Sequence, residues 1–139
     1  GRLRKGERGL GFQMTAREIA LNYLNAFSSG DPDAVAACVS ENFENNQIGL
    51  LGTGCKGREV YRRRLAGYLG TFRNIQYTAE NIIHDNDRVA IAYRMNAEDN
   101  DRPIEIYGVM LITISDGLIS VRSDYWDGLS YLKQVGIGL

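Results

Sequence analysis

From Ile75 onward the chain alternates apolar and polar residues, and short clusters of turn-forming residues interrupt this alternation three times. The clusters are Asp85-Asn86-Asp87, Asp99-Asn100-Asp101 and Ser115-Asp116-Gly117. Alternation with a period of two is typical of strands, and such clusters form tight turns. We therefore predict four strands, joined by short loops and thus antiparallel, near 75–84, 88–98, 103–114 and 118–126.

The first part of the chain carries helix signals instead. Thr15-Ala16-Arg17-Glu18 has the form of a capping box and predicts a helix that ends near Ser28-Ser29-Gly30. Asp31 and Pro32 then suit the start of a short second helix over about 33–39. Helices that precede a run of strands indicate an α+β domain, with the helices packed on one face of a curved, mainly antiparallel sheet.

A third helix is expected from Arg58, where apolar residues recur at helical spacing and include Tyr61, Leu65 and Tyr68. A short final helix is predicted over 128–135. The polar run 44–47 and the glycine-rich run 49–57, which lie between the second and third helices, are expected to form loops.

Length and composition are typical of one folded domain. We predict this domain over 14–139 of the 139 residues, after a basic, glycine-rich extension over 1–13. A net charge of −1 gives no reason to expect nucleic acid or an anionic membrane as a partner. Cys38 and Cys55 have no metal-ligand or disulfide spacing, so we expect reduced thiols, no metal and a cytoplasmic location. The sequence has no phosphate-binding or dinucleotide motif, so no cofactor is expected.

Side chains alternate between the two faces of a strand, so parity divides each predicted strand into two sets. On the strand over 88–98, the even set combines small residues with an arginine and an amide, which suits a cavity wall. This set is Ala90, Ala92, Arg94 and Asn96. On the last strand, Arg122, Asp124 and Trp126 share one side, whereas Asp127 falls on the other and suits the N-cap of the final helix.

Both faces of the predicted sheet carry apolar residues. On the strand over 103–114 the even residues are almost wholly apolar and form the better core face, while the odd set includes Tyr107, Val109 and Leu111. The helices can cover one face only, so the other is expected to meet a second copy of the sheet. The sequence thus predicts a homodimer through the outer sheet face.

Several stretches together resemble the nuclear transport factor 2-like superfamily, which includes the SnoaL-like polyketide cyclases, ketosteroid isomerase and limonene epoxide hydrolase. The stretches are YLNAFSSGD over 23–31, Gly57-Arg58-Glu59, the strand over 89–95, and 109–127 with its SDG turn and closing DYWD. The resemblance covers nearly the whole chain after Met14. It implies a cone-shaped α+β barrel with a deep, largely apolar pocket for a lipophilic small molecule.

The last strand, SVRSDYWDGLSYL, is most similar to that of limonene epoxide hydrolase, where an Asp-Arg-Asp relay opens the epoxide and a Tyr and an Asn hold the water. The resemblance places Asp124 at the base, Arg94 at the bridging arginine and Asn96 at the acid. Asn45 and Gln47 fall at the water-holding positions and can hydrogen-bond a water or polar ligand. An amide at 96 does not donate a proton as a carboxylic acid does, so that role is lost or moved.

The resemblance to ketosteroid isomerase holds at one functional position. Tyr23 falls at its oxyanion tyrosine, while Gln47 and Gly108 fall at its base and its oxyanion aspartic acid. Because both of those carboxyl groups are missing, steroid isomerisation by that route is not expected.

Two functions remain open from the sequence. In the first, Asp124 and Arg94 carry out acid–base chemistry such as hydrolysis, cyclisation or isomerisation. The expected ligand-binding residues are Tyr23, Asn45, Gln47, Asn96, Arg122 and Trp126. In the second, the chain is a non-catalytic ligand-binding or protein-interaction module, and Asp124 belongs to a buried salt bridge that fixes the barrel.

Overall fold

The computed structural model describes residues 14–137, so the extension expected over 1–13 lies outside the described residues. Its helices are α1 (Ala16–Ala26), the 3-10 helix η1 (Phe27–Ser29), α2 (Pro32–Ala36), α3 (Arg58–Thr71) and α4 (Gly128–Gln134). Its strands are β2 (Val39–Gln47), β3 (Cys55–Lys56), β4 (Phe72–Asp85), β5 (Arg88–Asp99), β6 (Arg102–Ser115) and β7 (Leu118–Trp126). The strands form one sheet in the order β3-β2-β7-β6-β5-β4.

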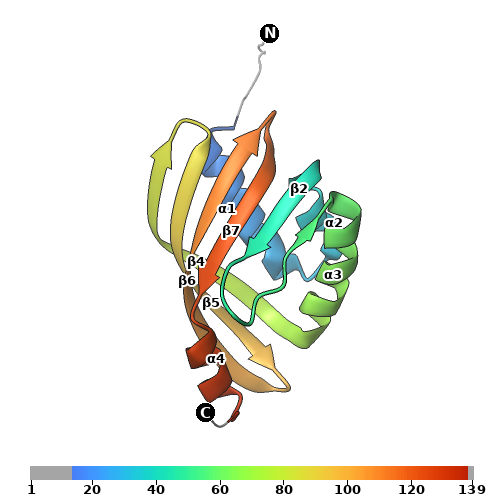
Figure 1. Ribbon diagram of the computed structural model, residues 1–139. Helices are drawn as coiled ribbons and strands as arrows, with labels where there is room; N and C mark the ends of the chain where they lie inside the picture. Colours follow the sequence, from blue (N-terminus) through green and yellow to red (C-terminus); the bar gives the residue numbers. More distant parts are fainter. Residues whose placement is uncertain (1–13, 138–139) are drawn as a thin grey trace.

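The sheet is curved, and α1 and α3 pack on one of its faces (Figure 1). All neighbouring strands pair antiparallel except β2 and β7, which are parallel. The sheet stays open, with β3 and β4 at its two edges. The predicted α+β class, with helices on a curved and mainly antiparallel sheet, is confirmed.

The N-terminal helices begin and end where local chemistry requires. The Thr15 hydroxyl accepts from the Glu18 backbone amide at 3.1 Å, and the Glu18 carboxylate accepts from the Thr15 amide at 2.8 Å, which confirms the predicted capping box. Gly30, with φ of 69°, ends the turn after α1, and the Asp31 side chain caps α2. Within 14–137, no helix is both long enough and apolar enough to cross a membrane.

Strand β2 was not predicted, because the run 44–47 was expected to form a loop. It pairs in parallel with β7, in a register that sets Asn45 opposite Arg122 and Gln47 opposite Asp124. Its backbone gains hydrogen bonds from this pairing, while its polar side chains gave no strand signal. The residues at 45 and 47 therefore lie beside the last strand, far from them in sequence.

The inward face of the sheet was predicted correctly on β6 and wrongly on β5. On β6 the even residues Ile104, Ile106, Met110, Ile112 and Ile114 are buried, as expected. On β5 the odd set is buried instead, because the register pairs it with the inward residues of β6. This inward set is Val89, Ile91, Tyr93, Met95 and Ala97. The small and polar even residues of β5, Arg94 and Asn96 among them, therefore face outward.

On β7, Arg122 and Asp124 are buried, which agrees with the parity prediction for this pair. Ile119 is buried on the same face although it has odd parity, because the pairing with β6 shifts register there. Thr113 opposes Val121 and Ile114 opposes Ile119, so Ser120 is the extra residue of a bulge.

Gly108 of β6 leaves space for a tyrosine ring from the next strand. A methyl group at this position would lie 2.5 Å from Tyr93 Oη and 2.8 Å from the Tyr125 carbonyl oxygen. Tyr93 opposes Gly108 on β5, and Trp126 opposes it on β7. The Tyr93 side chain can therefore pass over β6 and reach the far strand, β7.

Replacing Gly108 with alanine is expected to lower the free energy of unfolding by about 1–3 kcal/mol, because the added methyl group forces Tyr93 or the backbone to move. Urea unfolding of both proteins measures this difference. Gly70→Ala is the matched control. A methyl group at Gly70 in α3 meets nothing within 4 Å, so this variant should be as stable as the parent or more stable. Equal losses in the two variants would contradict the proposed contact.

Candidate functional site

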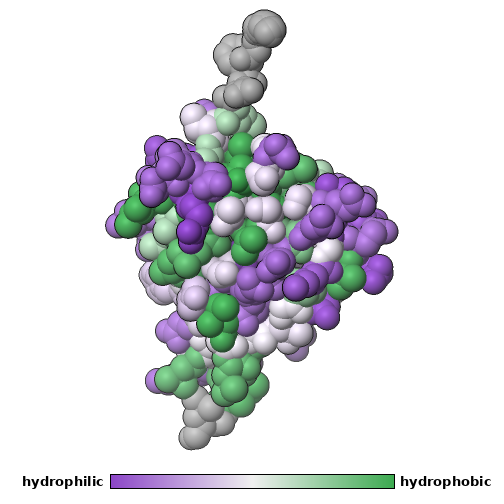
Figure 2. Space-filling view, turned by 45° about the horizontal axis from the view of Figure 1, so that its top comes forward, coloured by the Kyte–Doolittle hydropathy of each residue, from purple (hydrophilic) through white to green (hydrophobic). Residues whose placement is uncertain are grey.

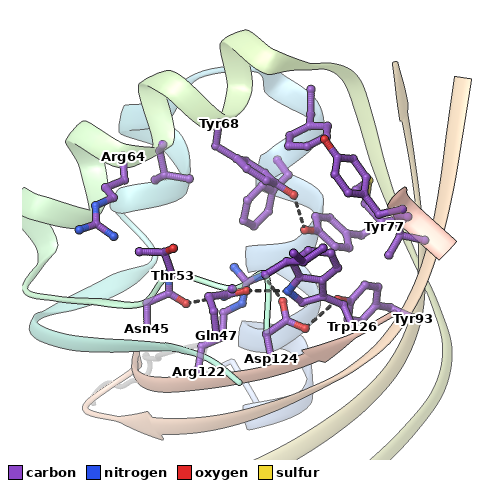
Figure 3. Close-up of a pocket in the computed structure, with 18 of the residues that line it drawn as sticks. Asn45, Gln47, Thr53, Arg64, Tyr68, Tyr77, Tyr93, Arg122, Asp124 and Trp126 are labelled. Atoms are coloured by element: carbon purple, nitrogen blue, oxygen red, sulfur yellow. Dashed lines mark hydrogen bonds and ion pairs between the residues drawn. The ribbon is translucent and has the colours of Figure 1, made fainter. Parts of the chain in front are cut away.

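A cavity of about 640 Å³ lies between the inner face of the sheet and the helices (Figure 3). Aromatic rings from η1, α3, β4, β5, β7 and α4 form much of its wall. These are Phe27, Tyr61, Tyr68, Phe72, Tyr77, Tyr93, Trp126 and Tyr131. Polar side chains at the β2 end include Asn45 and Gln47. The cavity is large enough for a small organic molecule.

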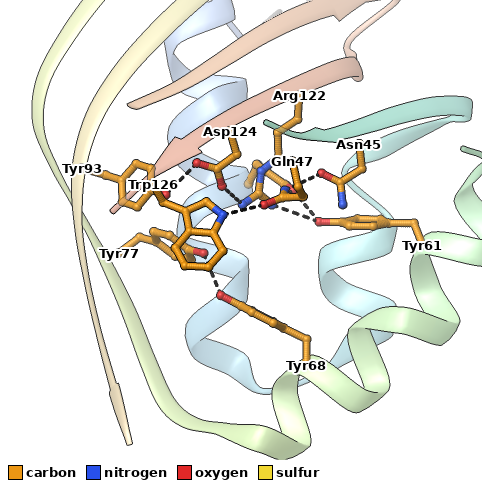
Figure 4. A network of polar contacts seen from close by, with 10 residues as sticks. Asn45, Gln47, Tyr61, Tyr68, Tyr77, Tyr93, Arg122, Asp124 and Trp126 are labelled. Atoms are coloured by element: carbon orange, nitrogen blue, oxygen red, sulfur yellow. Dashed lines mark hydrogen bonds and ion pairs between the residues drawn. The ribbon is translucent and has the colours of Figure 1, made fainter. Parts of the chain in front are cut away.

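Asp124 is the one carboxylate among the described residues that line the cavity. Its side chain points inward from β7, and the residue is 2% exposed. Tyr93 Oη donates to Asp124 Oδ1 at 2.7 Å, and Arg122 Nη2 donates to Asp124 Oδ2 at 2.5 Å (Figure 4). Each carboxylate oxygen therefore has one donor that holds it in place.

Arg122 links Asp124 to two further tyrosines. Its Nη1 donates to Tyr23 Oη at 2.7 Å and to Tyr61 Oη at 3.5 Å, and the two hydroxyls are hydrogen-bonded to each other. The guanidinium also lies 5.7 Å from the ring centroids of Tyr23 and Phe27, a distance at which cation–π attraction acts. Its Nε is buried without a hydrogen-bond partner among the described residues.

Burial raises the pKa of the tyrosine hydroxyls in this site, because a phenolate loses its hydration there. This applies to Tyr23, Tyr61, Tyr68, Tyr77 and Tyr93. For Arg122, burial acts to lower the pKa, but the surrounding oxygens of Tyr23, Asp124 and Tyr61 outweigh burial and raise it. At neutral pH the site therefore holds a permanent cation and several protonated hydroxyls.

A second chain of hydrogen bonds crosses from β7 to β2. Trp126 Nε1 donates to Gln47 Oε1 at 3.1 Å, and Gln47 Nε2 donates to Asn45 Oδ1 at 2.8 Å. The structure therefore brings Asn45, Gln47, Arg122, Asp124 and Trp126 together at one cavity. The remaining amide hydrogens of Asn45 are available to a polar ligand at this end.

Arg94 and Asn96 do not lie in this cavity, which corrects their predicted placement beside Asp124. Arg94 forms ion pairs with Glu80 at 3.6 Å and with Glu105 at 3.8 Å, and Asn96 Nδ2 donates to Glu105 at 3.4 Å. The cause is the β5–β6 register, which turns the even residues of β5 outward. Arg122 is the arginine that contacts Asp124.

Tyr23 also differs from its expected position. It is fully buried behind Arg122 and is not part of the cavity wall. The sequence interpretation missed four tyrosines of the site. Tyr61 and Tyr68 were assigned to the apolar face of α3, Tyr93 has the parity that was not chosen for the cavity, and the strand of Tyr77 was not divided into faces. The apolar even set of β6 was the available signal, because correct pairing with it turns Tyr93 inward.

Replacing Arg122 with methionine is expected to lower the free energy of unfolding by about 3–5 kcal/mol, because Asp124 then keeps a buried charge without its partner. Chemical denaturation measures the loss. Arg94→Met is the matched control, and its loss should stay below about 1 kcal/mol because its ion pairs are partly exposed. A larger loss for Arg94→Met than for Arg122→Met would contradict the geometry of the site.

Comparisons with solved structures place the fold among known ones. A protein of ketosteroid isomerase-like fold from Catenulispora acidiphila, in complex with trimethylamine, is 20% identical with a TM-score of 0.80, over 90% of this chain and 96% of that one. An epoxide hydrolase from M. tuberculosis that resembles limonene epoxide hydrolase is 18% identical with a TM-score of 0.75, over 86% and 87%. IdmH from Streptomyces antibioticus, a proposed polyketide cyclase, is 19% identical with a TM-score of 0.76, over 88% and 99%.

At these identities the structural likeness shows the fold alone. A search of curated protein sequences found no match. The family model of the SnoaL-like domain, however, matches residues 20–122, from α1 through most of β7. That match covers well over half of the sequence and includes four complete strands of the cavity wall, β2, β4, β5 and β6, together with η1 and α3. The chain therefore belongs to the SnoaL-like domain family.

Proposed function

We propose that the chain is a small-molecule enzyme that uses Asp124 as a general acid–base in a largely apolar cavity. The observation that carries this proposal is the position of Asp124, the one carboxylate among the described residues of the cavity wall. A general base must lie within hydrogen-bond reach of the proton it removes. A ligand that fills the cavity comes into contact with this carboxylate.

The neighbours of Asp124 suit proton transfer. Arg122 and Tyr93 fix the orientation of the carboxylate, so little reorganisation is needed when a substrate binds. The Arg122 cation also balances the negative charge of Asp124 before the proton is taken. In this proposal Arg122 takes the partner role that the sequence interpretation gave to Arg94.

A single carboxylate favours cyclisation or isomerisation over epoxide hydrolysis by a two-carboxylate relay. Such a relay needs a second acid at the substrate, and Asn96 lies on the outer sheet face. Asp124 alone can take a proton from carbon and return it to another atom of the same molecule. The aromatic wall favours a lipophilic substrate, because binding removes the apolar surface of such a molecule from water.

A non-catalytic ligand-binding module is the second candidate function. It is favoured by the low exposure of Asp124 and by the donors that already occupy both of its oxygens. In this case the Asp124–Arg122 pair holds β7 to the helices, and the cavity binds its ligand without changing it.

Asp124→Asn should lower the rate on any substrate that the parent converts by about a hundredfold or more, because the amide does not accept a proton at neutral pH. The measurement is turnover on a panel of cyclisable aromatic ketones and epoxides. Asp127→Asn is the matched control, since it makes the same change three residues away. Asp127 is exposed and caps α4 through Ser130, a role that asparagine also fills. Equal rates in both variants would remove Asp124 from the chemistry.

We also propose that the outer sheet face forms a homodimer. Large apolar side chains from three strands of the sheet are exposed there, namely Ile83 on β4, Tyr107 and Val109 on β6, and Tyr125 on β7. The space-filling view shows hydrophobic residues in patches between hydrophilic ones on the strand side of the molecule (Figure 2). Burying such a patch against its own copy removes apolar surface from water.

Light scattering on a sizing column should give the mass of two chains at micromolar concentration. Val109→Glu should shift the protein to one chain, because the new charge loses its water in the interface. Ala66→Glu, an exposed position on α3, adds the same charge away from the sheet and should leave the dimer intact. A parent protein with the mass of one chain would contradict the proposal.

A further inference from the structure

Two tyrosine hydroxyls in the cavity are hydrogen-bonded mainly to each other. Tyr68 on α3 and Tyr77 on β4 both line the cavity, and their Oη atoms are 3.1 Å apart (Figure 3). Tyr68 Oη has no other hydrogen bond among residues 14–137, and the Arg122 guanidinium is a further donor close to Tyr77 Oη. Both groups stay protonated at neutral pH, since burial raises the pKa of each.

Counting protons shows that this pair has a donor to spare. Two hydroxyls carry two protons, and one hydrogen bond between them uses only one. Whichever hydroxyl donates, the other keeps an O–H without an acceptor in the described part of the chain. By contrast, Tyr93 uses its proton on Asp124, and Tyr131 uses its proton on Asp99 at 2.8 Å.

The pair lies close to the Asp124 network. The Tyr77 ring meets the Tyr93 ring edge-on, with centroids 5.2 Å apart, and Tyr93 holds Asp124. Burial raises the pKa of Tyr77, the Arg122 cation acts to lower it and the Asp124 carboxylate acts to raise it. The buried Nε–H of Arg122 is a further donor without a partner in the described residues. Unpaired donors in an apolar cavity are costly unless a ligand atom accepts from them.

We propose that Tyr68 and Tyr77 form a donor site for the carbonyl oxygen of a lipophilic ketone. The chemistry of the pair favours this class, because its free group is an O–H donor and the Arg122 cation nearby attracts an oxygen with partial negative charge. A carbonyl oxygen accepts without bringing a proton of its own. The inference deepens the proposed function, because it names the substrate class. A catalytic role of this site rests on the proposed function of Asp124. Ketone binding does not, because it needs only the two hydroxyls.

The test compares two probes of the same shape, 2-acetylnaphthalene and 2-isopropenylnaphthalene, in which a CH2 group replaces the carbonyl oxygen. Binding is followed by probe fluorescence, and the carbonyl stretch of the bound ketone by infrared spectroscopy. Tyr68→Phe/Tyr77→Phe should weaken ketone binding about fivefold or more, the effect of one hydrogen bond, and leave alkene binding within about twofold. The carbonyl stretch should move to higher frequency in the double variant.

The single variants give a more specific expectation. Tyr68→Phe leaves the Tyr77 proton free, and Tyr77→Phe leaves the Tyr68 proton free, so each should keep the lowered carbonyl frequency of the parent. Tyr131→Phe is the control, because its hydroxyl also borders the cavity but is used on Asp99. Alkene binding shows whether the double variant keeps an intact cavity.

Several results would overturn the inference. One is an unchanged ratio of ketone to alkene affinity in the double variant. Two others need no variant. The first is a carbonyl stretch of the ketone in the parent protein at the same frequency as in hexane, where no hydrogen bond forms. The second is no ketone binding to the parent protein. None of these readouts depends on turnover. The two proposals can therefore fail separately. If ketone binding does not depend on Tyr68 and Tyr77 but Asp124→Asn still lowers turnover, only this inference is wrong. If ketone binding depends on the two tyrosines but Asp124→Asn leaves turnover unchanged, only the proposed function is wrong.

Discussion

The buried pair of Arg122 and Asp124 is the interaction on which the site depends. Two opposite charges stand on one strand, almost out of reach of water, and each needs partners beyond the other. Tyr23 and Tyr61 supply oxygens to the cation, and Tyr93 supplies a proton to the anion. The partners come from α1, α3 and β5, so the same pair connects both helices to the sheet.

This arrangement explains why the cavity is rich in tyrosine. A phenol has an apolar ring that can form a wall and a hydroxyl that can satisfy a buried charge. The rings of Phe27 and Tyr93 each contact the Tyr77 ring edge-on, which keeps the wall continuous. The wall therefore presents mainly apolar rings to a ligand and is polar only where the hydroxyl groups lie.

Much of the fold could be predicted from the sequence. The capping box, the three turn clusters and the apolar even set of β6 each have a local cause, and the structure contains all of them. Parity also placed Asp124 and Trp126 on the cavity side of β7. These features depend on residues that are close together in sequence.

The rest depended on pairing between distant segments. The small side chains of Ala90 and Ala92 suit a cavity wall, but the cavity is bordered by Tyr93 and Met95 on the other face of β5. The position of a cavity depends on how large side chains pack around it, so small residues in the sequence do not by themselves locate a cavity. Arg94 was assigned wrongly for this reason, and Arg122 was given too small a role.

Strand β2 has a consequence for how the chain avoids errors while it folds. Its parallel neighbour is the last strand, and the Gln47–Trp126 hydrogen bond joins residues 79 positions apart. A chain that is being synthesised therefore exposes the edge of β2 for a long time before β7 is available. Unpaired apolar strands tend to aggregate, whereas Glu44, Asn45, Asn46 and Gln47 keep this edge hydrated. The polarity that hides β2 from sequence analysis also protects it during this delay.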